Sequence, residues 1–329
     1  MAESTIRIRE ANAEDIPAVI ELSLKTVSES ISSFRKISPS SLMENRKKDL
    51  LILYKILELP DIKVFIADDE EKHLAGYCIA MVNYIESTTG ELQGWAFDRA
   101  IDKNFRRRGL GSALLSKADE FAKNSGMKYI CGEIDSSNIP ALEVSKNLGY
   151  VEERKKMLKV FSREPEILKA QSLFLVRRTV KEDIPKIKQL AVETVKFSIS
   201  SLREKSIEEC KEFRKKDLEN LENLISFPNF GAFIAETGDG EFAGHCFIMS
   251  GAIDTSTGEK QAWIYDLAVV EEHRGKGAGK MLLLEAEKFA AETGMEYVGL
   301  SVTSENQSAV YFYESMGYLE ERKQILKKL

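Results

Sequence analysis

The chain has 329 residues, with 47 Lys and Arg against 53 Asp and Glu, and a formal net charge of −6. This length predicts about two domains, and the acidic balance disfavours partners held by bulk charge, such as nucleic acid or an anionic membrane. Hydrophobic residues make up 43% of the chain, which is typical of a globular protein rather than a disordered or fibrous one.

The cysteines show no spacing typical of a metal or redox site, so we expect small buried side chains and no bound metal. The first residues are too polar for a secretory signal, and no apolar run approaches the roughly 18 residues of a membrane span. These features predict a cytosolic protein. The cysteines are Cys78, Cys131, Cys210 and Cys246.

The second half of the sequence repeats the first at a constant offset of 168 residues. A repeat of this length is a whole domain rather than a solenoid unit. We therefore predict two copies of one fold, a first domain at 1–165 and a second at 170–329, with the boundary near Lys169. The repeated segments include EDIP at 14–17 and 182–185, RKKDL at 46–50 and 214–218, and EERK at 152–155 and 320–323.

Each copy begins with an extended run, followed by a helix start in which Asp15 or Asp183 is the expected cap before a proline. Helical patterns continue to about Leu59 and Phe227. Three strands follow, with TTGE or STGE as the turn before the third. These strands are expected at 64–68, 75–82 and 92–101 in the first copy, and at 232–236, 243–250 and 261–270 in the second.

A basic, glycine-rich loop then leads into a helix whose apolar residues recur at helical spacing and which Gly126 or Gly294 ends. A strand, a short helix after Asn138 or Asn306, and a terminal strand are expected to complete each copy. The pattern predicts an α/β fold in each domain.

Glycines before a helix N-terminus let backbone N–H groups approach an anion, so the loop predicts a phosphate or pyrophosphate ligand. A Walker A loop fails, because Arg274 stands where its first glycine is required. The dinucleotide fingerprint fails as well, because the loop reads GxGxG and follows several strands. A basic loop that merely caps a helix is the remaining alternative. The two loops run from Arg106 to Ser112 and from Arg274 to Lys280.

Downstream of each loop lie N-x-x-A, at Asn138 or Asn306, and a closing G-Y. In this order the motifs resemble the acyl-CoA-binding motifs of the GCN5-related N-acetyltransferase (GNAT) superfamily, and the resemblance covers nearly the whole chain. It implies two tandem GNAT-like domains, each a mixed, mostly antiparallel sheet flanked by helices. The implied activity is transfer of an acyl group, most simply acetyl from acetyl-CoA, to a primary amine of a small molecule or peptide by direct attack. A non-catalytic CoA-binding sensor or scaffold is the alternative.

The resemblance also implies roles for residues of the second copy. Loop backbone N–H groups would hold the CoA pyrophosphate, the backbone of Leu267 and Val269 would pair with the pantetheine arm, and Asn306 would contact it. Tyr313 would protonate the departing thiolate, although a core role for this residue is the alternative. The loop residues are Arg274, Gly275, Lys276, Gly277, Ala278, Gly279 and Lys280; their counterparts in the first copy are Ile101, Arg106, Arg107, Arg108, Gly109, Leu110, Gly111, Ser112 and Asn138.

The first copy departs from the family pattern, because Ser145 replaces Tyr313 and Arg99 replaces Leu267. We therefore expect the chemistry in the second copy. Asp266 is the leading candidate for the general base, with fixing of the strand as an equal alternative.

Four further features have simpler interpretations. Asp254 and Glu259 either contact a cationic acceptor or are solvated turn residues. His273 and His245 are interpreted as packing residues, and the RKKDL segments as solvated helix faces.

Overall fold

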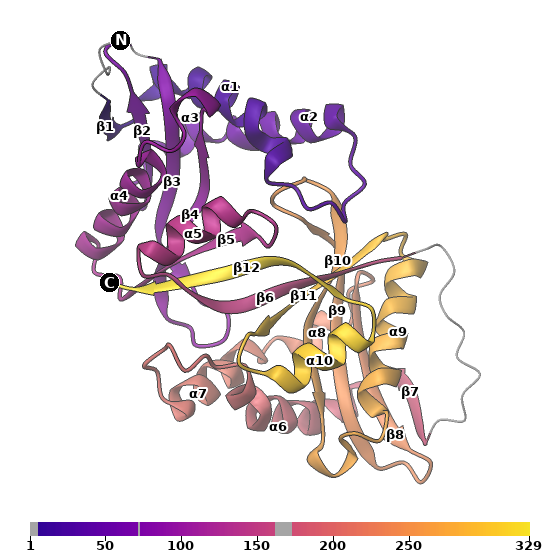
Figure 1. The fold of residues 1–329 in the computed structure, drawn as a ribbon. Helices are drawn as coiled ribbons and strands as arrows, with labels where there is room; N and C mark the ends of the chain where they lie inside the picture. The colour runs from indigo at the N-terminus through magenta and orange to yellow at the C-terminus, as the bar shows by residue number, and fades with distance from the viewer. Residues whose placement is uncertain (1–5, 72, 162–172) are drawn as a thin grey trace.

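The structure, a computed structural model, describes residues 6–71, 73–161 and 173–329, so the expected boundary near Lys169 lies outside the described residues. The strands join into one 12-stranded sheet (Figure 1). The first copy contains β1 (Arg7–Glu10), α1 (Ile16–Thr26), α2 (Pro39–Leu50), α3 (Leu53–Ile56), β2 (Ile62–Asp68), β3 (Leu74–Ile85), β4 (Leu92–Ile101), α4 (Leu110–Asn124), β5 (Tyr129–Asp135), α5 (Ile139–Asn147) and β6 (Val151–Val160). The second contains β7 (Phe174–Arg178), α6 (Ile184–Thr194), α7 (Ile207–Asp217), α8 (Leu221–Leu224), β8 (Phe230–Thr237), β9 (Phe242–Ile253), β10 (Lys260–Val269), α9 (Ala278–Glu292), β11 (Tyr297–Thr303), α10 (Gln307–Ser315) and β12 (Leu319–Lys328).

Helices cover both faces of the sheet, because each copy has apolar side chains on both sides of its strands. In the first copy α1 and α3 pack on one face and α4 on the other; α6 and α8, and then α9, repeat this arrangement. Among the described strands only the β4–β5 and β10–β11 pairs are parallel. The predicted mixed, mostly antiparallel sheet flanked by helices is confirmed.

The predicted caps at the first long helix of each copy are wrong. The Asp15 side chain does not cap α1, and Asp183 does not cap α6. Each carboxylate instead binds an arginine of the first strand of its copy, with Arg9 Nη1 2.7 Å from Asp15 Oδ2 and Arg177 Nη1 2.7 Å from Asp183 Oδ2. The aspartates therefore join the helix start to the sheet edge.

The terminal strands exchange between the copies. β6, the last strand of the first copy, pairs with β11, whereas β12, the last strand of the second copy, pairs with β5. β6 and β12 also pair with each other across the middle of the molecule (Figure 1). The expectation that each terminal strand completes its own copy is wrong. Two nearly identical strands can satisfy either edge, and the exchange leaves neither edge unpaired at the centre.

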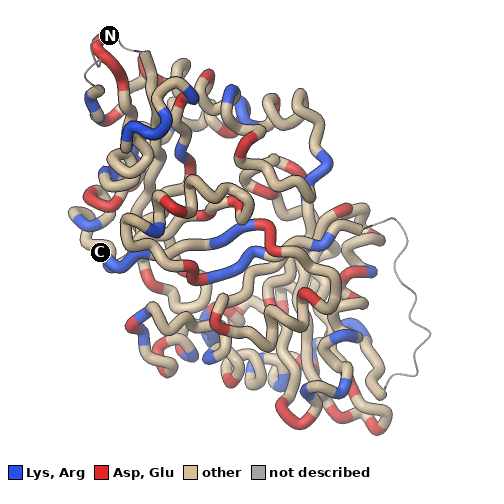
Figure 2. Tube along the Cα trace, viewed as in Figure 1, with Lys and Arg blue, Asp and Glu red and all other residues tan. Residues whose placement is uncertain are grey.

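The repeated EERK segments form a ring of charges where β6 and β12 cross. Lys155 pairs with Glu152 and Glu320, and Lys323 pairs with the same two carboxylates. Figure 2 shows the two signs of charge alternating along these central strands. Each lysine thus contacts an acid of both copies, which favours the exchanged pairing.

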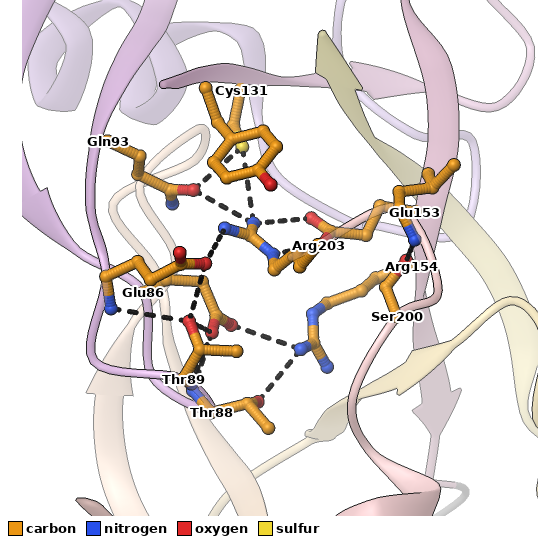
Figure 3. A network of polar contacts seen from close by, with 12 residues as sticks. Glu86, Thr88, Thr89, Gln93, Cys131, Glu153, Arg154, Ser200 and Arg203 are labelled. Atoms are coloured by element: carbon orange, nitrogen blue, oxygen red, sulfur yellow. Dashed lines mark hydrogen bonds and ion pairs between the residues drawn. The ribbon is translucent and has the colours of Figure 1, made fainter. Parts of the chain in front are cut away.

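Each copy also inserts one buried arginine into the other. Arg203, from the second copy, donates to Glu153 Oε1 at 2.5 Å and to Gln93 Oε1 at 2.9 Å (Figure 3). We call Arg203, Glu153 and Gln93 the Arg203 cluster. Its counterpart, the Arg35 cluster, joins Arg35 to Glu321 at 2.6 Å, to Asp254 at 3.2 Å and to Gln261 at 2.9 Å. These clusters fix the two copies in one orientation.

Candidate active site

The second copy opens a wedge in the sheet between β10 and β11. These strands pair only where Ala262–Ile264 meets Val298–Leu300, and beyond this point β11 continues along β6. A bulge between Ile264 and Asp266 accompanies the separation. The part of β10 that contains Leu267 and Val269 therefore has no described strand partner on its β11 side, as expected for a backbone that is to pair with a ligand.

The glycine-rich loop lies at the end of this wedge and leads directly into α9. Gly275 and Gly277 have φ of +71° and +102°, in the left-handed region that L side chains adopt at a cost. Arg274 Nε donates to the Val269 carbonyl at 3.0 Å, so this side chain anchors the loop to β10. The first N–H groups of α9 have no partner within the helix and provide an anion site.

A cavity of about 1330 Å³ begins at this loop and extends over the α6–α8 face of the sheet to residues of the first copy. Most of the cofactor residues expected in the second copy line it. Lys276, Ala278 and Tyr313 are not among its described lining residues. The lining residues that sequence analysis named are Asp266, Leu267, Val269, Arg274, Gly275, Gly277, Gly279, Lys280 and Asn306.

Asp266 is engaged on the acceptor side of β10. Arg214 pairs with its carboxylate, and His245 Nε2 lies 3.0 Å from Oδ2. Burial alone would raise the pKa of Asp266, but Arg214 and His245 outweigh it and hold the pKa well below its usual range. A carboxylate of low pKa accepts protons poorly. The geometry therefore favours the alternative role of fixing the strand.

The same arrangement recurs in the first copy, where Arg46 pairs with Asp98 and the Tyr77 hydroxyl donates to Asp98 at 3.0 Å. The interpretation of the RKKDL segments as solvated faces is thus wrong for Arg46 and Arg214, each of which reaches from a helix to the sheet. Sequence analysis also missed the contact of His245 with Asp266. The alignment of His245 with Tyr77, two rings with a polar head at one position, was the available signal.

Tyr313 belongs to the hydrophobic core between α10 and the sheet. Its ring packs against Phe312 and Tyr318, with centroids 5.2 and 5.8 Å away. Burial raises its pKa well above the usual value, and Cys246 and Asp266 act in the same direction. The phenol is therefore protonated at neutral pH. Cys246 is the β9 register partner of Leu267, which places the Tyr313 hydroxyl in the field of groups beside the wedge.

Asn306 begins α10 and uses both ends of its side chain within the protein. Its Oδ1 accepts from the Ala309 N–H at 3.2 Å, and its Nδ2 donates to the Phe197 carbonyl at 3.2 Å. Asn138 caps α5 in the same way, accepting from the Ala141 N–H at 3.2 Å. The recurring asparagine thus has a structural reason in both copies, and a cofactor contact by Asn306 stays a prediction.

The loop of the first copy follows the same path with different charges. Arg106 Nε donates to the Ile101 carbonyl at 3.1 Å, as Arg274 does to Val269, but its guanidinium also pairs with Glu29 at 2.7 Å. Glu29 takes Lys103 as well, at 3.1 Å. Arg107, at φ +64°, stands where the second copy has glycine. A carboxylate therefore neutralises the basic loop that was expected to bind pyrophosphate.

The wedge of the first copy is also altered. Arg99 takes the position of Leu267 and is the register partner of Cys78. Burial raises the pKa of Cys78 to about 12, and the charge of Arg99 partly offsets this rise. Ser145 does not present its hydroxyl as a proton donor to the wedge, because Ser145 Oγ donates to the Ala141 carbonyl at 2.9 Å.

Asp254 is neither an acceptor contact nor a solvated turn residue. It is buried between Arg35 and Arg322, which together with a bond from Thr257 outweigh burial and lower its pKa to about 2. His273 packs on Phe174, with ring centroids 5.6 Å apart, as expected.

The four cysteines are buried, as predicted. Within the described ranges no group of three or more His, Cys, Asp or Glu residues is placed to hold a metal, and no helix is long and apolar enough to cross a membrane.

The model of the acetyltransferase (GNAT) family matches residues 29–150 and again 199–318. A segment of 86 residues, 26% of this chain, is 36% identical to streptothricin acetyltransferase of Streptomyces lavendulae and covers 43% of that protein. A segment of 60 residues, 18% of this chain, is 40% identical to an uncharacterized N-acetyltransferase of Bacillus subtilis and covers 38% of it. The matched segments span less than half the length of these relatives.

Two solved structures share the fold over almost the whole chain. A GCN5-related N-acetyltransferase from Sphaerobacter thermophilus has a TM-score of 0.58 and 18% identity, covering 98% of this chain and 95% of that one. A tandem GNAT protein from the clavulanic acid biosynthesis pathway has a TM-score of 0.55 and 12% identity, covering 98% of both chains. The two family matches and the duplicated fold agree, and the chain belongs to the GNAT acetyltransferase family as a tandem of two such domains.

Proposed function

We propose that this protein is an N-acetyltransferase whose second copy transfers the acetyl group of acetyl-CoA to a primary amine. The observation that carries the proposal is the cavity, which joins the glycine-rich loop of the second copy to the acceptor face of β10. The loop residues of the first copy are not among its described lining residues. We accordingly assign catalysis to the second domain, and scaffolding and part of the acceptor site to the first.

Cofactor binding follows from the wedge and the loop. The open N–H groups at the start of α9 would hold the pyrophosphate, with Lys280 beside it in the cavity wall. The free side of β10 at Leu267 and Val269 would pair with the pantetheine arm. Acetyl-CoA supplies the activated acyl group, and the protein sets the position of its thioester beside the acceptor cavity.

Proton transfers need a donor for the thiolate and a route for the proton of the amine. Tyr313, kept protonated by burial, would protonate the departing sulfur. Each carboxylate that lines the cavity is ion-paired, so none is a free base within the described part of the chain. We infer that the amine loses its proton to water. The pairs are Glu86–Arg154, Glu133–Lys156, Asp217–Arg214 and Asp266–Arg214.

The test is thiol release from acetyl-CoA with a panel of primary amines, combined with calorimetric CoA titration. We expect one CoA per chain and release of free CoA that depends on the amine. Binding without turnover across the panel would overturn the enzyme proposal and favour a CoA sensor. Absence of CoA binding would favour a scaffold.

A further inference from the structure

The cavity continues far beyond the position of the thioester. The two tryptophans of the chain, Trp95 on β4 and Trp263 on β10, both line it. Between them the sheet order is β4, β5, β12, β6, β11 and β10, which makes five inter-strand spacings or about 24 Å across the sheet. An acceptor that occupied this length would contact both copies.

At the Trp263 end, the protein already places an ammonium group on the tryptophan. Lys156 Nζ lies 5.6 Å from the centroid of the Trp263 ring, and it pairs with Glu133. An aromatic face and a carboxylate together stabilise a cation. Lys156 comes from β6, so the exchange of strands brings this lysine to the second copy.

At the Trp95 end, the equivalent lysine is missing. The repeat offset pairs Trp95 with Trp263 and places Gln324 where Lys156 stands. Gln324 is neutral, and its Nε2 donates to Glu153 Oε2 at 3.0 Å. The cavity therefore has a second tryptophan without the ammonium group that its counterpart carries.

Two other differences between the copies make this end more favourable for a cation. Tyr84 packs against Trp95 with ring centroids 5.1 Å apart and planes at 42°, whereas the second copy has Ala252 at that position. Glu133 lines the cavity here, whereas its counterpart is Ser301. Burial raises the pKa of Tyr84, and the charges of Glu133 and then Glu86 raise it further, which shows a negative field at its hydroxyl.

We define Tyr84, Trp95, Glu133 and Gln324 as the distal subsite. We propose that it binds a second ammonium group of an elongated oligoamine, whose other end is the primary amine that is acetylated. This inference rests on the proposed function and names its substrate class. The first copy then selects the acceptor while the second performs the reaction.

The experiment measures kcat/KM for hexylamine, which carries one cation, and for spermine and pentalysine, which carry several. Trp95→Ala removes the aromatic face, and Gln324→Lys supplies the ammonium that Lys156 supplies at Trp263. We expect kcat/KM for the oligoamines to fall about tenfold in both variants, chiefly through KM, and that for hexylamine to change less than twofold. Tyr54→Ala, an exposed tyrosine on α3, is the matched control and should change neither.

A binding readout separates this inference from the proposed function. In Trp263→Phe the only tryptophan is Trp95, so its fluorescence should respond to spermine or pentalysine and not to hexylamine. Equal kcat/KM for all three amines, with no effect of Trp95→Ala or Gln324→Lys, would overturn the inference and leave the acetyltransferase standing. A response of Trp95 to the oligoamines without any turnover would support the distal subsite and overturn the proposed function.

Discussion

Around the loop before α9, the guanidinium of Arg274 lies over the ring of Phe197, 5.1 Å from its centroid. Around the equivalent loop before α4, Arg106 lies against Glu29, which occupies the position of Phe197. Both arginines still bind the carbonyl at the end of the third strand. Duplication has thus preserved the contacts that shape the loop, while the contacts that face a ligand have diverged.

The ion pair of Arg214 with Asp266 is informative for the opposite reason. Its counterpart, Arg46 with Asp98, is present in the copy that lacks the tyrosine at the wedge. A pair maintained in both copies fits a role in anchoring α2 or α7 to the sheet. Features shared by the copies explain the fold, and features confined to the second copy are the better guide to chemistry.

The largest expected effect comes from the residue that differs most clearly between the wedges. Tyr313→Phe should lower kcat about 100-fold or more, because it removes the proton donor and keeps the ring. The measurement is thiol release under saturating acetyl-CoA. Ser145→Ala in the first copy is the matched control, with kcat within twofold of the parent. A larger loss from the serine change would reverse the assignment of the catalytic copy.

The buried clusters allow a test of how strongly the copies are joined. Asp254 has a pKa of about 2 in the folded protein against an ordinary 3.8, so its ion pairs contribute about 2 kcal/mol at pH 7. This contribution is present above the ordinary pKa and is lost as the pH falls toward 2. Asp254→Asn should therefore lower the free energy of unfolding at pH 7, with a smaller difference from the parent at pH 3.

Urea unfolding at both pH values is the measurement for Asp254. Glu86→Gln is the matched variant of the other copy, since Arg154 and Arg203 likewise outweigh burial and lower the pKa of Glu86. We expect a loss of the same sign. A difference between Asp254→Asn and the parent that is the same at pH 7 and pH 3 would contradict the ion-pair explanation.

A smaller effect should follow when the charge of one loop is moved to the other. Phe197→Glu places a carboxylate beside Arg274, as Glu29 lies beside Arg106, and should weaken CoA binding about tenfold in calorimetry. Glu29→Phe is the reverse change and should leave one CoA per chain, because Arg99 still alters the first wedge. A second CoA in that variant would show that Glu29 alone closes the first site.

Local sequence signals determined much of this protein. The constant offset showed two copies, and apolar spacing with a terminal glycine located α4 and α9. The glycines of the second loop take the left-handed φ expected of them, at Gly275 and Gly277. These features depend on neighbours along the chain, so the residues themselves were sufficient to predict them.

Only the tertiary structure decided which copy each terminal strand joins, that Arg46 and Arg214 are buried, and that Trp95 shares a cavity with Trp263. Two nearly identical strands carry the same local pattern, so sequence cannot distinguish pairing within a copy from exchange between copies. A charged residue on a helix reads as solvated unless its distant partner is known. Long-range pairing, set by the packing of both copies together, therefore assembled the acceptor side of the site.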